Sequence, residues 1–281
     1  MEHTNQNHAS AKTVSLCQKQ GNSRAVWDQL RVDAAQMAAA EPQLEKMLED
    51  VVLSRGSLAE SLSARLARKL SREDMQRGEL EPLLTDVLGG NQRIVDSASR
   101  DMQAIVDRDP ACQSALEPLL FFKGFLAITS YRMSHQLWHD GRKLLALYFQ
   151  SLGSEVFGVD IHPAARIGCG ILLDHATSVV IGETSIVEDD VSILHEVTLG
   201  GTGKQTGNRH PIVRSGVLIG AGSKILGRVT IGECAKIGAG SVVLEDVPPH
   251  QTVAGVPAVI VGESSEENPA LDMNQQIGGG I

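Results

Sequence analysis

Aromatic residues are scarce in this chain, and the last 124 residues have none. Only 3% of the 281 residues are Phe, Trp or Tyr, and the last of them is Phe157. Glycine shows the opposite bias, because 20 of the 28 glycines lie at or after Gly158. A composition change this sharp predicts a domain boundary near residue 158.

Cysteine, basic charge and long apolar runs are also in short supply. The four cysteines form no Cys-x-x-Cys pair, which argues against a zinc knuckle or a disulfide framework and fits a reducing cytoplasm. A net charge of −9 disfavours nucleic acid as a partner, because phosphates need cations to neutralise them. The most apolar run, "LEPLLFFKGFLAITS", is interrupted by Lys123 and is too short to cross a membrane. The polar opening "MEHTNQNHAS" lacks the apolar segment of a secretory signal, so we expect a cytoplasmic protein.

The first half has the periodicity of α-helices. After a polar head, residues 1–22, which we expect to be mobile, apolar residues recur every three or four positions. The segments "AVWDQLRVDAAQMAAA" and "SLAESLSARLARKL" are examples, and Ser57 is a candidate N-cap for the second. Several short helices joined by short links predict a helical bundle over residues 23–157.

The second half repeats every six residues, which is the period of neither an α-helix nor a single strand. Each hexapeptide is interpreted as one short strand and a corner, so three of them form a triangular coil of about 18 residues. Successive coils stack at about 4.8 Å, with one aliphatic side chain per face pointing inward. The sequence therefore predicts an α+β protein in which a parallel β-helix fills residues 158–262. The aliphatic positions fall in two phases, with Ser185 as the weak member of the first: Ile161, Ile167, Leu173, Val179, Val191 and Val197, then Val213, Ile219, Ile225, Ile231, Ile237 and Val243.

Two interruptions of the repeat carry polar chemistry. The segment "GGTGKQTGNRHPI", residues 200–212, holds four glycines, a proline and an Arg-His pair, and it predicts a loop extruded from the coil. Asp174 and His175 stand side by side within the repeat itself. A purely structural repeat needs neither a carboxylate nor an imidazole, which titrates near pH 6.5, at this point. Asp160 precedes His175 by slightly less than one full coil, which would place both near one edge on successive coils.

Five short segments of the chain are distinctive: "VDIHPAARIG", "LDHAT", "VSILHEVTLGGTGK", "RHP" and "AGVPA". They resemble segments of the bacterial serine O-acetyltransferases, a family of left-handed β-helix enzymes with a helical N-terminal half. The resemblance covers about residues 24–262 and the terminal isoleucine. It implies transfer of acetyl from acetyl-CoA, a co-substrate, to the hydroxyl of L-serine, with no permanent cofactor and no metal. It also implies a homo-oligomer, a trimer or a dimer of trimers joined through the helical domain.

The resemblance assigns roles to eleven residues within the two domains. His175 is the general base, oriented by Asp160. Serine is bound by Asp109, Asp174, Arg209 and His210, and the loop of one chain serves the site of its neighbour. Acetyl-CoA lies along a groove at Gly201, Thr202, Ala221, Lys236 and Ala239. The matched residue His162 and the neighbouring His195 have no assigned task.

The last segment, "ESSEENPALDMNQQIGGGI", residues 263–281, is acidic and polar and predicts a flexible tail. Relatives end in isoleucine and insert that end into O-acetylserine sulfhydrylase, so the resemblance implies the same partner for Ile281. L-Cysteine has the amino and carboxyl groups of L-serine, and is expected to inhibit by competing with it.

Three other functions are compatible with parts of the pattern. The first is a hexapeptide-repeat acyltransferase with a different acceptor. The second is a metal lyase like the γ-type carbonic anhydrases, for which His175, His195 and His210 are available as zinc ligands. The third is a protein without catalytic activity that only docks its C-terminal tail onto a partner.

Overall fold

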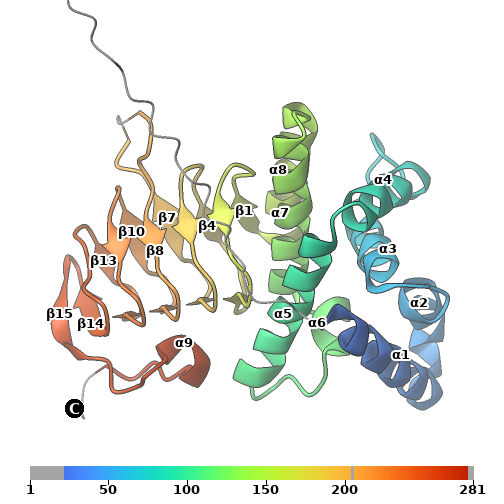
Figure 1. Cartoon of the computed structure of the whole chain (residues 1–281), viewed down its shortest axis with the longest axis horizontal. Coiled ribbons are helices and arrows are strands. Elements are labelled where there is room, and N and C mark those ends of the chain that lie inside the picture. Colours follow the sequence, from blue (N-terminus) through green and yellow to red (C-terminus); the bar gives the residue numbers. More distant parts are fainter. Residues whose placement is uncertain (1–21, 204–205, 278–281) are drawn as a thin grey trace, which may run out of the picture.

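The structure, a computed structural model, describes residues 22–203 and 206–277. It has two parts side by side: a group of helices and a β-helix with its coils stacked away from them (Figure 1). The predicted helical bundle followed by a parallel β-helix is confirmed. The helices are α1 Ser23–Ala40, α2 Glu45–Leu48, α3 Leu58–Leu70, α4 Arg77–Gly89, α5 Gln92–Arg108, α6 Leu116–Leu120, α7 Lys123–His139 and α8 Lys143–Phe157, with a 3₁₀ turn at Pro42–Leu44 and a π turn at Glu49–Leu53.

Local sequence sets the ends of these helices. The Ser57 side chain accepts a hydrogen bond from the backbone N–H of Glu60, which confirms it as the N-cap of α3. Gly158 ends α8 in the left-handed conformation, with φ at 66°, which glycine adopts without steric cost. The chain then turns directly into the first strand of the β-helix.

The β-helix has three faces, each a ladder of very short parallel strands. The first face holds β1 Val159–Ile161, β4 Val179–Ile181, β7 Thr198–Gly200, β10 Lys224–Leu226 and β13 Val242–Val243. The second face holds β2 Arg166–Ile167, β5 Ile186–Val187, β8 Ile212–Val213 and β11 Thr230–Ile231. The third face holds β3 Leu172–Leu173, β6 Ser192–Ile193, β9 Leu218–Ile219, β12 Lys236–Ile237, β14 Gln251–Gly255 and an antiparallel strand, β15 Ala258–Glu263.

The aliphatic residues of the six-residue repeat fill the interior of the β-helix. Every member of both phases is at most 9% exposed, and Ser185 is buried among them. Burying an aliphatic side chain of this size contributes about 1.5–3 kcal/mol, so the repeat itself is the main source of stability of this part. The corners between faces are left free to carry polar side chains.

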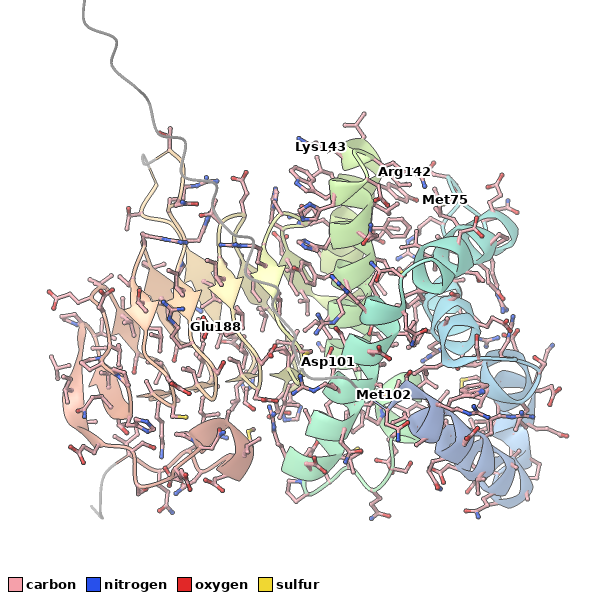
Figure 2. The ribbon with its side chains drawn as sticks, viewed as in Figure 1. Met75, Asp101, Met102, Arg142, Lys143 and Glu188 are labelled. Atoms are coloured by element: carbon pink, nitrogen blue, oxygen red, sulfur yellow. The ribbon has the colours of Figure 1, made fainter. Side chains whose placement is uncertain are left out.

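Buried polar contacts join α5 and α7 to the first coils. Asp101 on α5 is fully buried at the junction (Figure 2), where its carboxylate accepts two hydrogen bonds from Arg132 at 2.7 and 3.0 Å. The second oxygen of Asp101 accepts the backbone N–H of Ile171 at 2.9 Å. Arg132 also donates to the carbonyl of Gly168, and Arg108 donates to the hydroxyl of Ser192. The helices are thereby fixed against the first coils of the β-helix.

The helices and the cysteines bear on two expectations from the sequence, the lack of a membrane span and the lack of a disulfide framework. Within residues 22–203 and 206–277, no helix combines the length and the apolar character that crossing a bilayer requires. Cys112 and Cys234 are free and buried, and Cys169 is fully buried in the first coil.

Candidate functional site

His175 lies in the corner between the third and first faces, which we name the histidine edge. The corner follows β3 directly and is held by a hydrogen bond from the backbone N–H of Asp174 to the carbonyl of Ile193. His175 and Ala176 both adopt the left-handed conformation, with φ at 54° and 58°. Such residues cost free energy and are frequent at functional sites. The imidazole is 76% exposed, and its Nε2 lies 3.8 Å from Oδ1 of Asp174.

A cavity of about 650 Å³ brings together three of the predicted site residues. Asp109 reaches it from the end of α5, and Asp174 and His175 reach it from the histidine edge. One oxygen of Asp109 accepts the backbone N–H of Ala111, which orients the carboxylate. An adjoining cavity of about 310 Å³ contacts the same three residues and is also lined by Phe121, Phe122 and the first residues of α7. The site thus offers two carboxylates and an exposed imidazole beside a hollow of substrate size.

The histidine edge continues along the stack as a column of corners. Backbone hydrogen bonds link the corners: Gly222 N–H donates to the carbonyl of His195, and Gly240 N–H donates to that of Ala221. His195 therefore follows His175, and their rings lie edge to face with centroids 5.9 Å apart. Ala221 and then the exposed Ala239 come next, so two of the predicted acetyl-CoA residues lie on the same edge as the proposed base. Small side chains leave the backbone of this edge accessible to an extended ligand.

Asp160, Arg209 and His210 lie elsewhere, toward the corner between the first and second faces, which we name the loop edge. Asp160 is in the middle of β1 and accepts a hydrogen bond from Gln150 at 2.7 Å. Arg209 donates to Glu183 at 2.8 Å. This hydrogen bond lowers the pKa of the Glu183 carboxyl, while burial, followed by the charge of Arg209, lowers the pKa of His210. The loop edge therefore holds a second group of charged residues.

Among the described residues, no hydrogen bond or ion pair joins Asp160 to His175. The expectation from spacing assumed three hexapeptides per coil, but β1 pairs with β4 so that Val159 aligns with Val179, a longer step than three hexapeptides give. Asp160 consequently aligns with Val180 on the first face, beyond the corner that holds His175. Within one chain the predicted residues form two separate half-sites.

The other three predicted acetyl-CoA residues lie in two different places, the start of the extruded loop and the third face. Gly201 and Thr202 begin the extruded loop after β7, and a side chain on Gly201 would contact Arg209. Lys236 is only 3% exposed on the third face, where it forms a 3.3 Å ion pair with Glu266 of the C-terminal segment. Its ammonium group is therefore covered by protein in this structure.

The C-terminal segment differs in part from the flexible tail expected over residues 263–281. It includes a short helix, α9 Pro269–Asp272, in which Ala270 is fully buried and bonded through its backbone to Gly216 and Ser192. A few apolar side chains within this mostly polar segment make the packing possible. Leu271 and Met273 line the cavity of His175, and Ile277 packs over Gly238. Ile281 lies outside the described residues, as does most of the polar head.

Sequence reasoning missed the residues that hold the loop in place. Thr184 and Arg228 bind the backbone at Arg209 and His210 through hydrogen bonds at the loop edge, and Glu183 binds the Arg209 side chain. The only signal was position, since residues 182–185 and 227–229 fall at the corner from which the loop is extruded.

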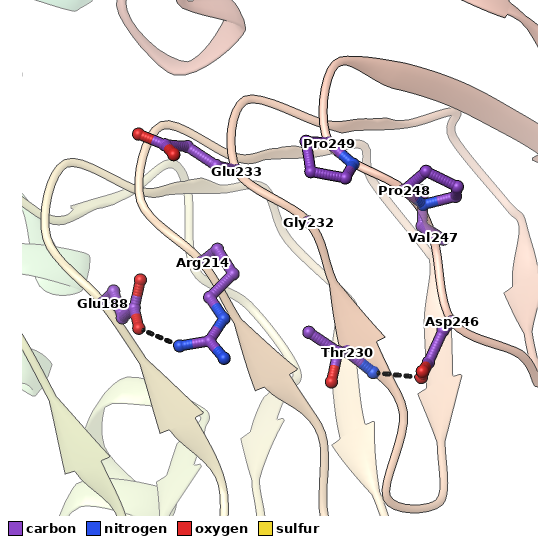
Figure 3. Close-up of a pocket in the computed structure, with 9 residues that line it drawn as sticks. All are labelled: Glu188, Arg214, Thr230, Gly232, Glu233, Asp246, Val247, Pro248 and Pro249. Atoms are coloured by element: carbon purple, nitrogen blue, oxygen red, sulfur yellow. Dashed lines mark hydrogen bonds and ion pairs between the residues drawn. The ribbon is translucent and has the colours of Figure 1, made fainter.

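A separate hollow of about 570 Å³ lies on the second face and contains no predicted site residue. Figure 3 shows two interactions among its charged groups: Glu188 pairs with Arg214 at 2.5 Å, and Asp246 accepts the backbone N–H of Thr230 at 2.6 Å. The three histidines considered as zinc ligands are also divided, because His210 is on the loop edge while His175 and His195 are on the histidine edge.

Comparison with known proteins identifies close relatives. Residues 26–130 match the family model "Serine acetyltransferase, N-terminal", and residues 210–245 match "Bacterial transferase hexapeptide (six repeats)". The serine acetyltransferase of Haemophilus influenzae is 51% identical over 250 residues, which are 89% of this chain and 94% of the relative.

Solved structures named as serine acetyltransferases agree over most of the fold. One in complex with cysteine has a TM-score of 0.89 at 50% identity, covering 91% of this chain and 99% of its own. The Brucella abortus protein in complex with coenzyme A has a TM-score of 0.84 at 48% identity, covering 86% and 96%. The soybean protein in complex with serine has a TM-score of 0.83 at 49% identity, covering 85% and 98%.

Proposed function

The chain belongs to the serine acetyltransferase family, and on that premise we propose that the two half-sites of neighbouring copies combine into its active site. The enzyme transfers acetyl from acetyl-CoA to L-serine, giving O-acetyl-L-serine and CoA, the first step from serine toward cysteine. Its relatives are solved with coenzyme A, serine and cysteine, which supports these ligands. L-Cysteine carries the same amino and carboxyl groups as serine and acts as an inhibitor. The single observation that carries the site is the convergence of Asp109, Asp174 and His175 on one cavity.

His175 acts as the general base. A serine hydroxyl is too weakly acidic to attack a thioester unaided, so the imidazole accepts its proton as the oxygen attacks the thioester carbonyl. The tetrahedral intermediate collapses by breaking the C–S bond, and the imidazolium returns the proton to the departing CoA sulfur. Asp109 and Asp174 offer negative charge to the ammonium group of serine beside the same cavity. The edge at Ala221 and Ala239 accommodates the pantetheine arm.

The remaining groups come from a second copy. Arg209 can bind the serine carboxylate with two hydrogen bonds, and Asp160 can orient the imidazole, only if the loop edge of one chain faces the histidine edge of the next. A head-to-tail contact of this kind repeats around a ring. We therefore propose a trimer as the minimal active assembly and two trimers joined through the helical domains as the complete one. A cytoplasmic location stays a prediction.

Mixing two inactive variants is expected to restore activity. In a ring assembled at random from equal amounts of His175→Asn and Arg209→Ala chains, about a quarter of the interfaces combine an intact histidine edge with an intact loop edge. Release of CoA from acetyl-CoA in the presence of L-serine, followed with a thiol reagent, should recover to roughly that fraction of wild type.

The matched control mixes His175→Asn with Asp174→Asn, which lie on the same edge. Every interface then carries at least one defect, so no recovery is expected. If the first mixture also stays inactive although both chains are shown to co-assemble, the site is contained within one chain and the shared arrangement is wrong.

Deletion of Ile281 is expected to abolish co-elution with O-acetylserine sulfhydrylase while acetyl transfer continues. An isoleucine with a free carboxylate has the shape and charge of an amino-acid ligand, which favours a pocket built for such a ligand. Size-exclusion chromatography of the two enzymes together measures the complex. Unchanged co-elution of the shortened chain would contradict a partnership through this residue.

A further inference from the structure

Thr184 is the meeting point of the hydrogen bonds that hold Arg209 and His210. Its hydroxyl oxygen accepts the backbone N–H of Arg209 at 3.0 Å and that of His210 at 3.1 Å. Arg228 completes the arrangement by donating to the carbonyls of Thr184 and His210, both at 2.9 Å. The end of the extruded loop is thereby fixed to the corner of the coil beneath it.

The same threonine contacts the imidazole of His210. Its backbone N–H donates to Nδ1 of His210 at 3.1 Å, and its hydroxyl lies 2.9 Å from the same nitrogen. A backbone N–H can only donate, so Nδ1 must be the acceptor and cannot carry a proton in this arrangement. The hydroxyl, whose oxygen already accepts two N–H groups, has its own hydrogen left to donate to Nδ1.

Because Nδ1 is engaged, Nε2 is the ring nitrogen that remains able to contact a ligand. His210 is 7% exposed and packs directly over Gly182, where a Cβ atom would lie 2.1 Å from Nε2. No hydrogen bond to Nε2 is formed by any residue in the part of the chain that the structure describes. With Nδ1 occupied as an acceptor, a neutral His210 carries its proton on Nε2 and offers one N–H donor to a ligand.

The charges around the ring agree with a neutral state. Burial is the largest influence that lowers the pKa of His210, and the cations Arg209 and Arg228 and the neighbouring His162 act in the same direction. Glu183 acts in the opposite direction, and it is already paired with Arg209.

We infer that Thr184 is a positioning residue that holds His210 as the neutral tautomer protonated on Nε2, so that this N–H donates to the carboxylate of the amino-acid substrate. The inference rests on the proposed function for the identity of that ligand. The tautomer itself follows from the contacts of Thr184 alone. A fixed donor beside the cationic Arg209 distinguishes a carboxylate from groups that cannot accept a hydrogen bond.

The tautomer can be measured without any substrate. Magic-angle-spinning NMR of protein labelled with ¹⁵N-histidine separates protonated from unprotonated ring nitrogens and is not limited by molecular size. The signals of His210 are assigned as those lost in His210→Gln. We expect a protonated Nε2 and an unprotonated Nδ1 at pH 7.5. A proton on Nδ1, alone or on both nitrogens, would overturn the inference.

Variants of Thr184 test its influence on the substrate. Thr184→Val removes the hydroxyl with little change of shape, while the backbone N–H that donates to Nδ1 stays in place. The backbone N–H groups of Arg209 and His210 lose their shared acceptor. The KM for L-serine should therefore rise about 10-fold or more, as expected for a weakened hydrogen bond to a charged group. The kcat should change much less, because the lost interaction is made equally in the ground state and the transition state. Thr184→Ser keeps the hydroxyl and should restore KM to within about 3-fold of wild type, while its NMR signals keep the Nε2–H form.

Thr230→Val is the matched control, because Thr230 lies on the second face outside both half-sites, and its KM should equal that of wild type. An unchanged KM for Thr184→Val would refute the role of the hydroxyl. So would a KM for Thr184→Ser as high as that of Thr184→Val. If L-serine proved not to be the substrate, the NMR experiment would still test the tautomer of His210, because it uses no substrate. Failure of the inference and failure of the proposed function are thus distinguishable.

Discussion

Replacing His175 with asparagine is expected to lower serine-dependent release of CoA by roughly 10²–10⁴-fold, the usual contribution of a general base. Asparagine is the informative substitution, because it tolerates the left-handed backbone conformation that His175 adopts at φ 54°. The side chain is 76% exposed, so the fold should not depend on it. Steady-state rates of thiol release with saturating acetyl-CoA and varied L-serine measure the effect.

His250→Asn is the matched control for this substitution. His250 is also an exposed corner residue in the left-handed conformation, with φ at 56°, but it lies near β14, outside both half-sites. Its replacement should leave the rate within a factor of about two of wild type, since surface substitutions of this kind have small effects. If His175→Asn kept more than about a tenth of wild-type activity, a general-base role would be untenable.

Asp101→Ala is expected to destabilise the protein more than any surface substitution. The change leaves the guanidinium of Arg132 buried without its ion-pair partner and removes the acceptor of the Ile171 N–H. Breaking a buried ion pair in this way costs about 3–5 kcal/mol. Thermal unfolding followed by circular dichroism should show a fall of roughly 10 °C in Tm.

Two variants establish the cause of that loss. Asp107→Asn changes an exposed carboxylate on the same helix and should alter stability by about 0.5 kcal/mol or less. The double variant Asp101→Leu with Arg132→Met removes both charges and should be more stable than the sum of the single losses predicts. A Tm within about 2 °C of wild type for Asp101→Ala would show that the pair does not hold the two parts together.

The residues inside the β-helix could be predicted from the sequence because the six-residue pattern of aliphatic residues recurs in many coils. Each aliphatic position of the six-residue period is buried, and the one weak member, Ser185, is buried as well. The helical half was readable for a similar reason, and Ser57 caps α3 as its position indicated. The loop was readable as the place where neither period could continue.

The arrangement of the site was readable only in part. A period indicates which side chains point inward, but it does not give the length of each coil, and the first coil, from Val159 to its partner Val179, is longer than three hexapeptides. This difference separates Asp160 from His175 within the chain. Nor does a period show which corner holds a loop in place, so Thr184 and Arg228 gave no signal. The packing of α9 depends on Ala270 and a few apolar neighbours within a polar segment, which composition averages away.

The reversal of β15 has a consequence for the ends of the stack. A column of parallel coils could in principle grow without limit, because each terminal coil exposes unpaired backbone groups to another molecule. Here α8 packs against β1 at one end, and at the other β15 runs antiparallel to β14, a direction that no further parallel coil could follow. The strands left at the ends of the other two faces are only two residues long. The β-helix is therefore closed to end-to-end fibre growth, and association is directed to its sides, where the two half-sites lie.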